Sequence, residues 1–216
     1  MLKIFDFIKR TLKGDSIYRI LFNWKVYENC RNLEGIIIDL ASGKRHEYLD
    51  FLKNKNVCVI KADINPSSKP DVVLNLNQKL PFGDEYADHV FLFNALYILK
   101  DPEQVLKEVY RILKKGGKIF LANMFIFHES PEPDDFYRFT SQKLNELLKN
   151  AGFSQIKILP IGERFSASIF LIYHFFPRSL RIFIYGGALF LDKATNFLKF
   201  RKKHPCPIGY FCIAEK

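Results

Sequence analysis

The sequence predicts an α/β fold in which helices cover both faces of a doubly wound, mostly parallel sheet. Three observations lead to this prediction. Short apolar segments alternate with amphipathic ones along the middle of the 216-residue chain, as in repeated strand–helix units. The apolar segments lack polar alternation, because both faces of a strand in a parallel sheet are buried. Acidic or amide residues stand at the ends of several of these segments, namely Asp39, Asp63, Asn75 and Asn94.

Each predicted strand is a short apolar run bounded by turn-forming residues. The strands are expected at 35–40, 56–63, 71–75, 87–94, 118–123, 154–160 and 210–214. Helices are expected over roughly 44–54, from Asp101 to the Gly116–Gly117 pair, and from Thr140 to Gly152. The helix after Asp101 has the clearest signals, because Asp101 can cap its first turn and Pro102 suits its first position.

The composition is that of one folded domain. Hydrophobic residues make up 48% of the chain and charged residues 26%, which excludes wholesale disorder. The four cysteines have no CxxC spacing, so we expect free thiols in a reducing, cytoplasmic setting. The five histidines lack metal-ligand spacing, so no metal site is predicted.

The net charge of +10 lies mostly at the two ends of the chain. Residues 1–34 carry seven Lys or Arg against four Asp or Glu, and residues 160–216 carry nine against three. Both ends are also rich in Phe, Ile and Leu, which fits an anionic membrane surface better than nucleic acid. The apolar stretch 165–191 contains His174, Pro177 and two arginines, so a transmembrane helix is not predicted. The first residues mix charge with apolar side chains, so no cleavable signal peptide is expected.

Four segments, in order, resemble the motifs of class I S-adenosylmethionine-dependent methyltransferases of the type 11 kind. They are the strand and turn 36–43 (IIIDLASG), the acidic segment 60–66 (IKADINP), the LPF segment 80–90, and the helix–GG–strand segment 106–121. The resemblance covers roughly residues 34–159. It implies a Rossmann-like sheet with an antiparallel last strand, and S-adenosylmethionine as the cofactor.

The resemblance also implies which residues hold the cofactor. A glycine-containing turn after the first strand lets backbone N–H groups approach the methionine portion. Asp63, 24 residues after Asp39, is placed to accept hydrogen bonds from both ribose hydroxyls. The expected cofactor-binding residues are Asp39, Ala41, Ser42, Gly43, Asp63, Ile64, Asn75, Leu76 and Asn94.

Two departures from the family pattern leave a non-catalytic alternative open. Ala41 stands where the family has its first glycine, and Arg45 stands at the position of the third. Tyr97 and Ile98 replace a Glu-His pair that many relatives have after the fourth strand. The alternative is therefore a scaffold, or a module that binds a membrane or a partner, with a degenerate cofactor motif.

A polar segment after the fifth strand is the candidate acceptor site. Its sequence DDFYRFT resembles a signature of family members encoded with sugar- and envelope-polymer enzymes. His128 is the candidate general base, because an imidazole can take a proton from a hydroxyl near neutral pH. The candidate acceptor-binding residues are Asp134, Asp135, Tyr137 and Arg138. A local ion pair of Arg138 with the aspartates, with Tyr137 packed, is the equal alternative.

The two ends are interpreted as additions to the methyltransferase-like domain. Residues 1–34 form an amphipathic helical extension, with Leu2, Phe5, Ile8 and Leu12 on one side of a helix. The domain spans 35–216 and has a helical insertion at about 163–204. These helices either pack as an extra layer or contact the inner face of a membrane peripherally.

The predicted activity is methyl transfer to an oxygen, or to a nitrogen, of a small-molecule or glycan-type acceptor that could be lipid-linked. The oligomeric state stays open.

Overall fold

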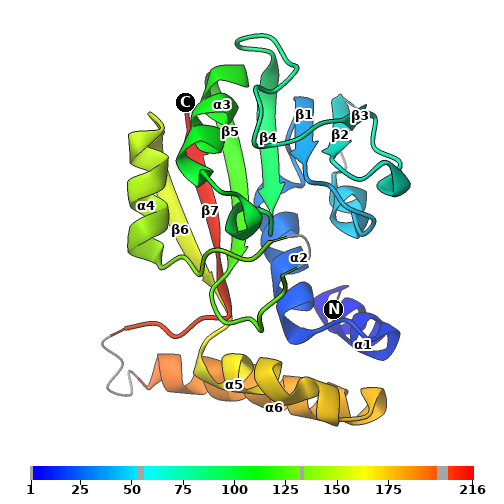
Figure 1. Ribbon diagram of the computed structural model, residues 1–216. Coiled ribbons are helices and arrows are strands. Elements are labelled where there is room, and N and C mark those ends of the chain that lie inside the picture. The colour runs from blue at the N-terminus through cyan, green and yellow to red at the C-terminus, as the bar shows by residue number, and fades with distance from the viewer. Residues whose placement is uncertain (1, 53–55, 132–133, 199–203) are drawn as a thin grey trace.

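The computed structural model describes residues 2–52, 56–131, 134–198 and 204–216. They form one seven-stranded sheet in the order β3-β2-β1-β4-β5-β7-β6 (Figure 1). Strands β1 to β5 are mutually parallel, and β7 runs antiparallel to both of its neighbours. The strands are β1 (Gly35–Leu40), β2 (Val57–Asp63), β3 (Val72–Val73), β4 (Ala87–Phe93), β5 (Leu113–Met124), β6 (Ser154–Ile161) and β7 (Gly209–Glu215). The predicted fold class is thus confirmed.

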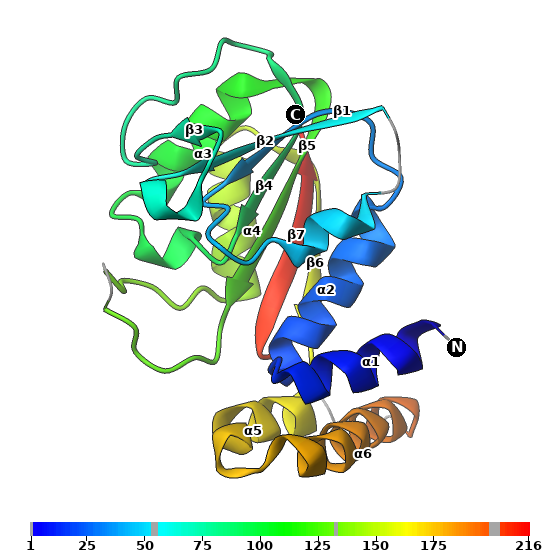
Figure 2. The same ribbon diagram turned by 90° about the vertical axis from the view of Figure 1, so that its right-hand side faces the viewer.

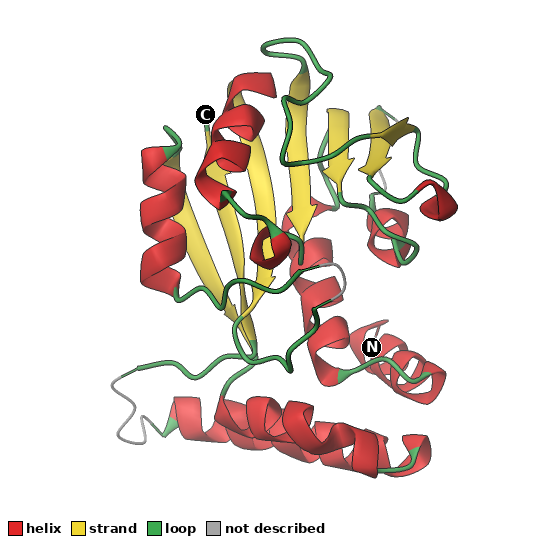
Figure 3. Ribbon diagram, in the orientation of Figure 1, coloured by secondary structure: helices red, strands yellow, loops and turns green. Residues whose placement is uncertain are grey.

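Helices cover both faces of the sheet and one of its ends (Figures 1 and 3). One face is covered by α3 (Pro102–Ile112) and α4 (Ser141–Asn150), and the other by α2 (Ile17–Cys30). The helices α1 (Leu2–Lys13), α5 (Arg164–Ile172) and α6 (Arg178–Phe197) lie beyond the carboxyl ends of the parallel strands. Four short 3₁₀ helices are η1 (Glu47–Phe51), η2 (Pro66–Ser68), η3 (Leu96–Ile98) and η4 (Tyr173–Phe175).

The strands are apolar throughout because each contributes to two cores. In β1, Ile38 and Leu40 belong to the core beneath α3 and α4, whereas Ile37 belongs to the core beneath α2. Since α2 shares this second core with the sheet, it covers the sheet as closely as the helices on the other face. The division of the chain at residue 34 into an extension and a domain stays a prediction.

Glycine at the first position of β1 permits a close approach of two strands. Gly35 has φ of +83°, and a Cβ there would lie 2.3 Å from the Asp88 carboxylate. That carboxylate accepts a hydrogen bond from the backbone N–H of Ile36 at 2.8 Å. The pairing anchors the amino end of β1 beside β4, which fixes the register at their carboxyl ends.

The helix expected over 44–54 is wrong: the described part of that range has only η1, and residues 53–55 lie outside the description. No side-chain cap is made at His46, the residue before η1. The face of the sheet that an α-helix would have covered is occupied by α2, against which Tyr48 and Leu49 pack. The short η1 is sufficient between β1 and β2, because α2 covers the part of the sheet that the expected helix would have covered.

The expected end of α3 at Gly116–Gly117 is also wrong, because the helix ends at Ile112 and β5 begins at Leu113. Leu113 pairs with Ala87, and the next paired positions are Lys118 and His89, so the extra residues of β5 form an irregularity. Gly116 takes φ of +76° within it. Strand pairing with β4 therefore ends the helix before the glycines are reached.

Candidate functional site

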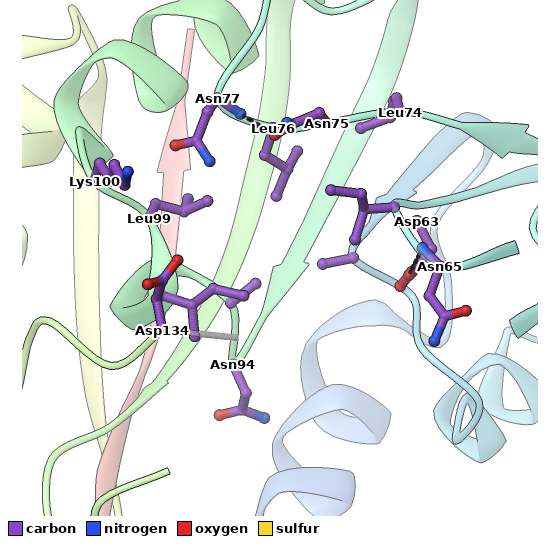
Figure 4. Close-up of a pocket in the computed structure, with 14 residues that line it drawn as sticks. Asp63, Asn65, Leu74, Asn75, Leu76, Asn77, Asn94, Leu99, Lys100 and Asp134 are labelled. Carbon is purple, nitrogen blue, oxygen red and sulfur yellow. Dashed lines mark hydrogen bonds between the residues drawn. The ribbon is translucent and has the colours of Figure 1, made fainter. Parts of the chain in front are cut away.

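A cavity of about 670 Å³ lies at the carboxyl ends of β1, β2 and β4 (Figure 4). Ala41 follows β1, Asp63 ends β2, and Asn94 follows β4, and all three line the cavity. Ile64, Asn75 and Leu76 line it as well. Six of the nine predicted cofactor-binding residues therefore line one cavity. Parallel strands bring their carboxyl ends to one edge of a sheet, which explains why residues far apart in sequence meet here.

The Asp63 carboxylate is held by two backbone N–H groups. Its Oδ2 accepts from Gly43 N at 2.8 Å, and its Oδ1 accepts from Asn65 N at 2.8 Å. Each carboxylate oxygen has two acceptor sites, so each oxygen keeps one for a ligand. Asp63 is mostly buried yet lines the cavity. The carboxylate is thus oriented before any ligand arrives.

The turn after β1 has the backbone conformation that the family's glycines adopt easily. Ala41 has φ of +53° and Gly43 has φ of +61°. A non-glycine residue in this left-handed region costs roughly 1–2 kcal/mol, so Ala41 is strained. Ser42 donates its backbone N–H to Ala62 O at 3.1 Å, which holds the turn against β2. Among the described residues, Ser42 and Gly43 are not in the cavity lining and support it from behind.

Asp39 is buried beneath the cavity and is not part of its described lining. Its Oδ2 accepts a hydrogen bond from the Tyr48 hydroxyl at 2.8 Å, while its Oδ1 is buried with no hydrogen-bond partner. Burial raises the pKa of this carboxyl from 3.8 to about 7, although the Tyr48 hydrogen bond opposes the rise. Of the two predicted acidic residues, Asp63 therefore lines the cavity, whereas Asp39 lies inside the protein with its side chain hydrogen-bonded to Tyr48.

Asn94 is positioned by a helix that sequence analysis did not connect with the site. The Tyr18 hydroxyl, on α2, lies 2.5 Å from Asn94 Oδ1. Tyr18 is almost completely buried, and burial raises its pKa well above the usual value. Asn94 itself has φ of +53° and donates its backbone N–H to Ala122 O at 2.8 Å. No sequence signal identified Tyr18, because it is 76 positions away and its partner is chosen by packing.

Arg45 leaves the cavity open. Its guanidinium pairs with Asp15 at 2.5 Å and with Glu47 at 3.8 Å, and the side chain is 54% exposed. Asp15 is almost fully buried and also contacts Arg10 at 3.5 Å. The bulky residue at the family's glycine position is thus turned toward the segment between α1 and α2.

The segment after β5 divides between the cavity and a local network. Asp134 lines the cavity, on the opposite side from Asp63 (Figure 4). Asp135 forms an ion pair with Arg138, whose guanidinium also donates to the backbone oxygen of His128 at 3.0 Å. Hydrogen bonding from Arg138 lowers the pKa of Asp135 to about 2. The local ion pair therefore exists for Asp135, and Asp134 is the acid presented to the cavity.

Aromatic rings surround this network. The Arg138 guanidinium lies over the rings of Tyr97 and Phe127, at 5.7 Å and 5.9 Å from their centroids. Tyr137 donates its hydroxyl to Lys100 O at 3.1 Å, outside the described cavity lining. The exposed His128 ring lies 4.0 Å from the Phe127 ring, also outside that lining. Arg138, Tyr137 and His128 therefore make contacts within this segment and with its neighbours.

Sequence analysis missed several lining residues. Asn65 and Asn77 lie near Asp63 and Asn75, and Asn77 N donates to Asn75 Oδ1 at 2.9 Å. Ile98 and Lys100 follow β4 and complete the wall beside Asp134. The Asn-x-Asn spacing was a usable signal for Asn77, since such side chains form local turns at loops. Ile98 is apolar at a position where the family often has a histidine, so polarity could not reveal it.

The cavity fits a nucleoside-containing cofactor such as S-adenosylmethionine. Its volume lies within the range of small-molecule sites, about 300–1,000 Å³. The two carboxylate oxygens of Asp63 can accept hydrogen bonds from two neighbouring hydroxyl groups of a ribose. Leu76 and Ile98 are apolar lining residues against which a planar base can pack. Asn75 and Asn77 offer amide groups that donate and accept at the same wall.

Comparison with known proteins finds similarity to methyltransferases in the middle of the chain. Residues 39–121 match the model of a methyltransferase domain. An uncharacterized protein of Methanocaldococcus jannaschii is 30% identical over 136 residues, which are 57% of this chain and 65% of that protein. A ubiquinone/menaquinone biosynthesis C-methyltransferase of Rickettsia prowazekii is 32% identical over 130 residues, 51% of this chain and 52% of the enzyme. The chain thus spans between half and two thirds of the length of these relatives.

Solved structures agree in fold. Phosphoethanolamine N-methyltransferase 2 of Haemonchus contortus, in complex with S-adenosyl-L-methionine, has a TM-score of 0.62 at 16% identity. The match covers 90% of this chain and 52% of that enzyme. The motifs, the match over residues 39–121 and the likeness in fold agree with one another, and this part of the chain is similar to methyltransferase domains.

Proposed function

We propose that the protein transfers a methyl group from S-adenosylmethionine to an oxygen, or to a nitrogen, of a small-molecule or glycan-type acceptor. The observation that carries the proposal is the Asp63 carboxylate, which two backbone N–H groups orient at one side of a cavity of suitable volume. Asp134 stands on the opposite side, where an acceptor would enter. The relatives compared above are a C-methyltransferase and an N-methyltransferase by name. Because they differ in the acceptor atom, the atom that this protein methylates has to be identified by experiment.

The proposed division of labour follows from the side chains. Asp63 binds the ribose hydroxyls, and Asn75, Leu76 and Ile64 surround the adenine. Ala41, Ser42 and Gly43 form the turn beside the methionine portion, while Asp39 supports that turn from within the sheet. Asn94, held by Tyr18, contacts the cofactor near its sulfonium end.

S-adenosylmethionine supplies an already activated methyl group, so the protein has chiefly to position the acceptor. Transfer breaks the methyl–sulfur bond, forms the bond to the acceptor heteroatom, and releases the acceptor's proton. His128 is the proposed base for that proton, with Asp134, Asp135, Tyr137 and Arg138 as the acceptor segment. His128 lies outside the described lining, so this role requires the segment to move when an acceptor binds.

The acceptor is proposed to be presented at a membrane, as a glycan on a lipid carrier at the cytoplasmic face. The support is positional. The cavity lies at the carboxyl ends of β1, β2 and β4, and α1, α5 and α6 lie beyond that end of the sheet (Figure 1). None of the helices that the structure describes has the length and hydropathy to span a bilayer. The acceptor would therefore be reached from one leaflet.

The rival function is a methyltransferase-fold scaffold that has lost the cofactor. The strained Ala41 and the internal position of Asp39 are the observations in its favour. The two functions differ in a simple binding experiment.

Titration calorimetry with S-adenosylmethionine and S-adenosylhomocysteine is the test. We expect both to bind the wild-type chain, and Asp63→Asn to weaken binding at least about tenfold, because an amide donor replaces an acceptor that faces hydroxyls. The matched control is Asp50→Asn, an exposed carboxylate on η1 outside the cavity, which should bind as the wild type does. Failure of the wild type to bind either ligand at millimolar concentration would establish the scaffold. Methyl transfer from labelled cofactor into membrane lipid or glycan fractions then identifies the acceptor atom.

A further inference from the structure

The helices beyond the sheet present an apolar surface that the fold leaves uncovered. On α6, Phe183 is 77% exposed, Phe190 is 70% exposed and Phe197 is 85% exposed. With Leu180, these residues recur at helical spacing and form one stripe along the helix. Every residue of α6 is described. Arg178, Arg181 and Asp192 lie off this stripe in the sequence pattern, whereas Lys193 lies beside it, three residues after Phe190 and four before Phe197.

The opposite side of α6 is the one that packs on the protein. Tyr185, Ala188 and Asp192 are buried there. Asp192 accepts hydrogen bonds from Phe165 N at 2.9 Å and from Ser166 N at 3.0 Å, both in the first turn of α5. These bonds fix the rotation of α6 about its axis, so its phenylalanines are held outward.

Helix α1 repeats this arrangement. Its predicted apolar face is exposed, with Phe5 at 74%, Ile8 at 39% and Leu12 at 49%. Among the α1 side chains whose burial is described, Thr11 is the fully buried one, and its hydroxyl donates to Phe7 O at 2.7 Å. The partly buried Phe7 packs against Trp24. An amphipathic helix normally buries its apolar side against the core, so this one is oriented toward something outside the chain.

The exposed side chains belong to one layer. Helix α6 contacts both α1 and α5, and Figure 2 shows the three helices side by side at one end of the molecule. The α5–η4 segment adds Leu171 at 58% and Phe175 at 84% exposure. Isolated exposed hydrophobics are ordinary, but a clustered set of this kind marks an interaction surface.

The charge of the layer decides between occupants. Helix α1 has four basic residues against one acidic residue, and α5 with α6 has the same numbers. These two acids already have partners, because Asp6 pairs with Arg10 and Asp192 accepts hydrogen bonds from the first turn of α5. Lys9, Lys13 and Lys193 are exposed. A second copy would bring cations against cations, whereas an anionic bilayer satisfies both the phenylalanines and the lysines.

We propose that α1, α5 and α6 form a docking surface for an anionic lipid bilayer, into which the phenylalanines of α6 insert to the level of the acyl-chain boundary. Docking places the carboxyl edge of the sheet, and with it the cavity, on the membrane side of the protein. The proposal stands on exposure and charge, and it holds whether or not the cavity binds a cofactor.

The experiment is sedimentation of the full chain with vesicles of phosphatidylcholine alone or with about 30% phosphatidylglycerol. We expect binding to the anionic vesicles, weakened strongly by high salt. The variant Phe183→Ser/Phe190→Ser/Phe197→Ser should lower the partition coefficient at least about tenfold, since three aromatic anchors are lost. The matched control is Val73→Ser/Tyr86→Ser/Phe136→Ser, which removes three exposed hydrophobics elsewhere on the surface and should bind as the wild type does.

A second variant separates charge from hydrophobicity. Lys9→Gln/Lys193→Gln should reduce binding to anionic vesicles several-fold and leave residual binding to neutral vesicles unchanged. Unfolding midpoints of all variants check that the fold is retained. Equal partition of the triple α6 variant and its control would overturn the proposal. So would a wild-type dimer, seen by light scattering, that the α6 variant dissociates, because the surface would then serve self-association.

Discussion

The Tyr48 hydroxyl donates a 2.8 Å hydrogen bond to Oδ2 of Asp39, and both groups are buried near the end of β1, just before the turn that begins at Ala41. Only one of the two carboxylate oxygens is satisfied. Because burial disfavours the charged form, the pKa of Asp39 rises to about 7. This acid therefore affects the stability of the fold in the physiological pH range.

The free energy of unfolding should fall as pH rises from about 4 to 7 on account of Asp39. In that range the folded state binds a proton that the unfolded state releases, so the stabilising protonated form is lost through the folded-state pKa. Asp39→Asn keeps an acceptor for Tyr48 and cannot titrate. Its stability relative to the wild type should improve by up to about 4 kcal/mol between pH 4 and pH 8. Urea unfolding at both values measures this, and a constant difference, like that expected of Asp50→Asn, would contradict it.

Ala41→Gly should strengthen cofactor binding several-fold. Glycine relieves the left-handed strain at φ of +53° and removes a methyl group from the cavity wall. The relief is partly offset by the greater entropy of the unfolded chain, so stability should rise by only about 0.5–1 kcal/mol. Lys69→Gly is the matched control, because Lys69 has φ of +52° and is exposed outside the described lining. Lys69→Gly should be more stable in thermal unfolding, and its affinity for the cofactor, measured by titration calorimetry, should equal that of the wild type. An equal rise in affinity in both variants would contradict the assignment.

Arg45→Ala should destabilise the fold and leave the cofactor site intact. Removing the guanidinium leaves the buried Asp15 carboxylate with Arg10 at 3.5 Å as its remaining described cation. A loss of about 1–3 kcal/mol is expected from such a partly unpaired buried acid. The dissociation constant for S-adenosylhomocysteine should change less than about twofold, since Arg45 is directed away from the cavity. A marked gain in affinity would instead show that Arg45 obstructs the site. Arg45→Lys, which keeps the charge, should recover part of the stability.

Tyr18→Phe tests whether the N-terminal helix supports the cofactor site. The change removes the donor to Asn94 Oδ1 without altering the ring that packs in the core. We expect a loss of about 0.5–1.5 kcal/mol in stability and a several-fold weaker affinity for S-adenosylmethionine. The exposed Tyr86→Phe is the control. Unchanged affinity in Tyr18→Phe would mean that the hydrogen bond is only structural.

Much of the site was predictable because parallel strands bring their carboxyl ends to one edge of the sheet, where ligands bind. Residues such as Ala41, Asp63, Asn75 and Asn94 were located by their positions after apolar runs, and the strand ends do bring them around one cavity. Asp39 was predicted by the same rule but is internal, because side chains alternate along a strand and the end of β1 turns this one away from the cavity. Periodicity identifies a strand end without stating which side its last residue faces.

Helix bounds failed where tertiary contacts competed with local signals. The Gly116–Gly117 pair predicted the end of the helix. The helix ends earlier, at Ile112, because Leu113 already pairs with Ala87 of β4 as part of the sheet. Likewise, an α-helix was expected over 44–54 because nothing local indicated that α2 would cover that face. Tertiary contacts outweigh local propensity in both cases, through strand pairing in the first and burial of a sheet face in the second.

By itself, the sequence determined the alternation of strands and helices, the family motifs and the amphipathic character of the ends, since each depends on residues close together along the chain. The tertiary structure alone decided that Tyr18 holds Asn94, that Arg45 turns to Asp15, and that the apolar face of α1 points outward. These outcomes depend on which surfaces meet across long sequence separations, where packing and charge pairing choose among partners that periodicity cannot distinguish.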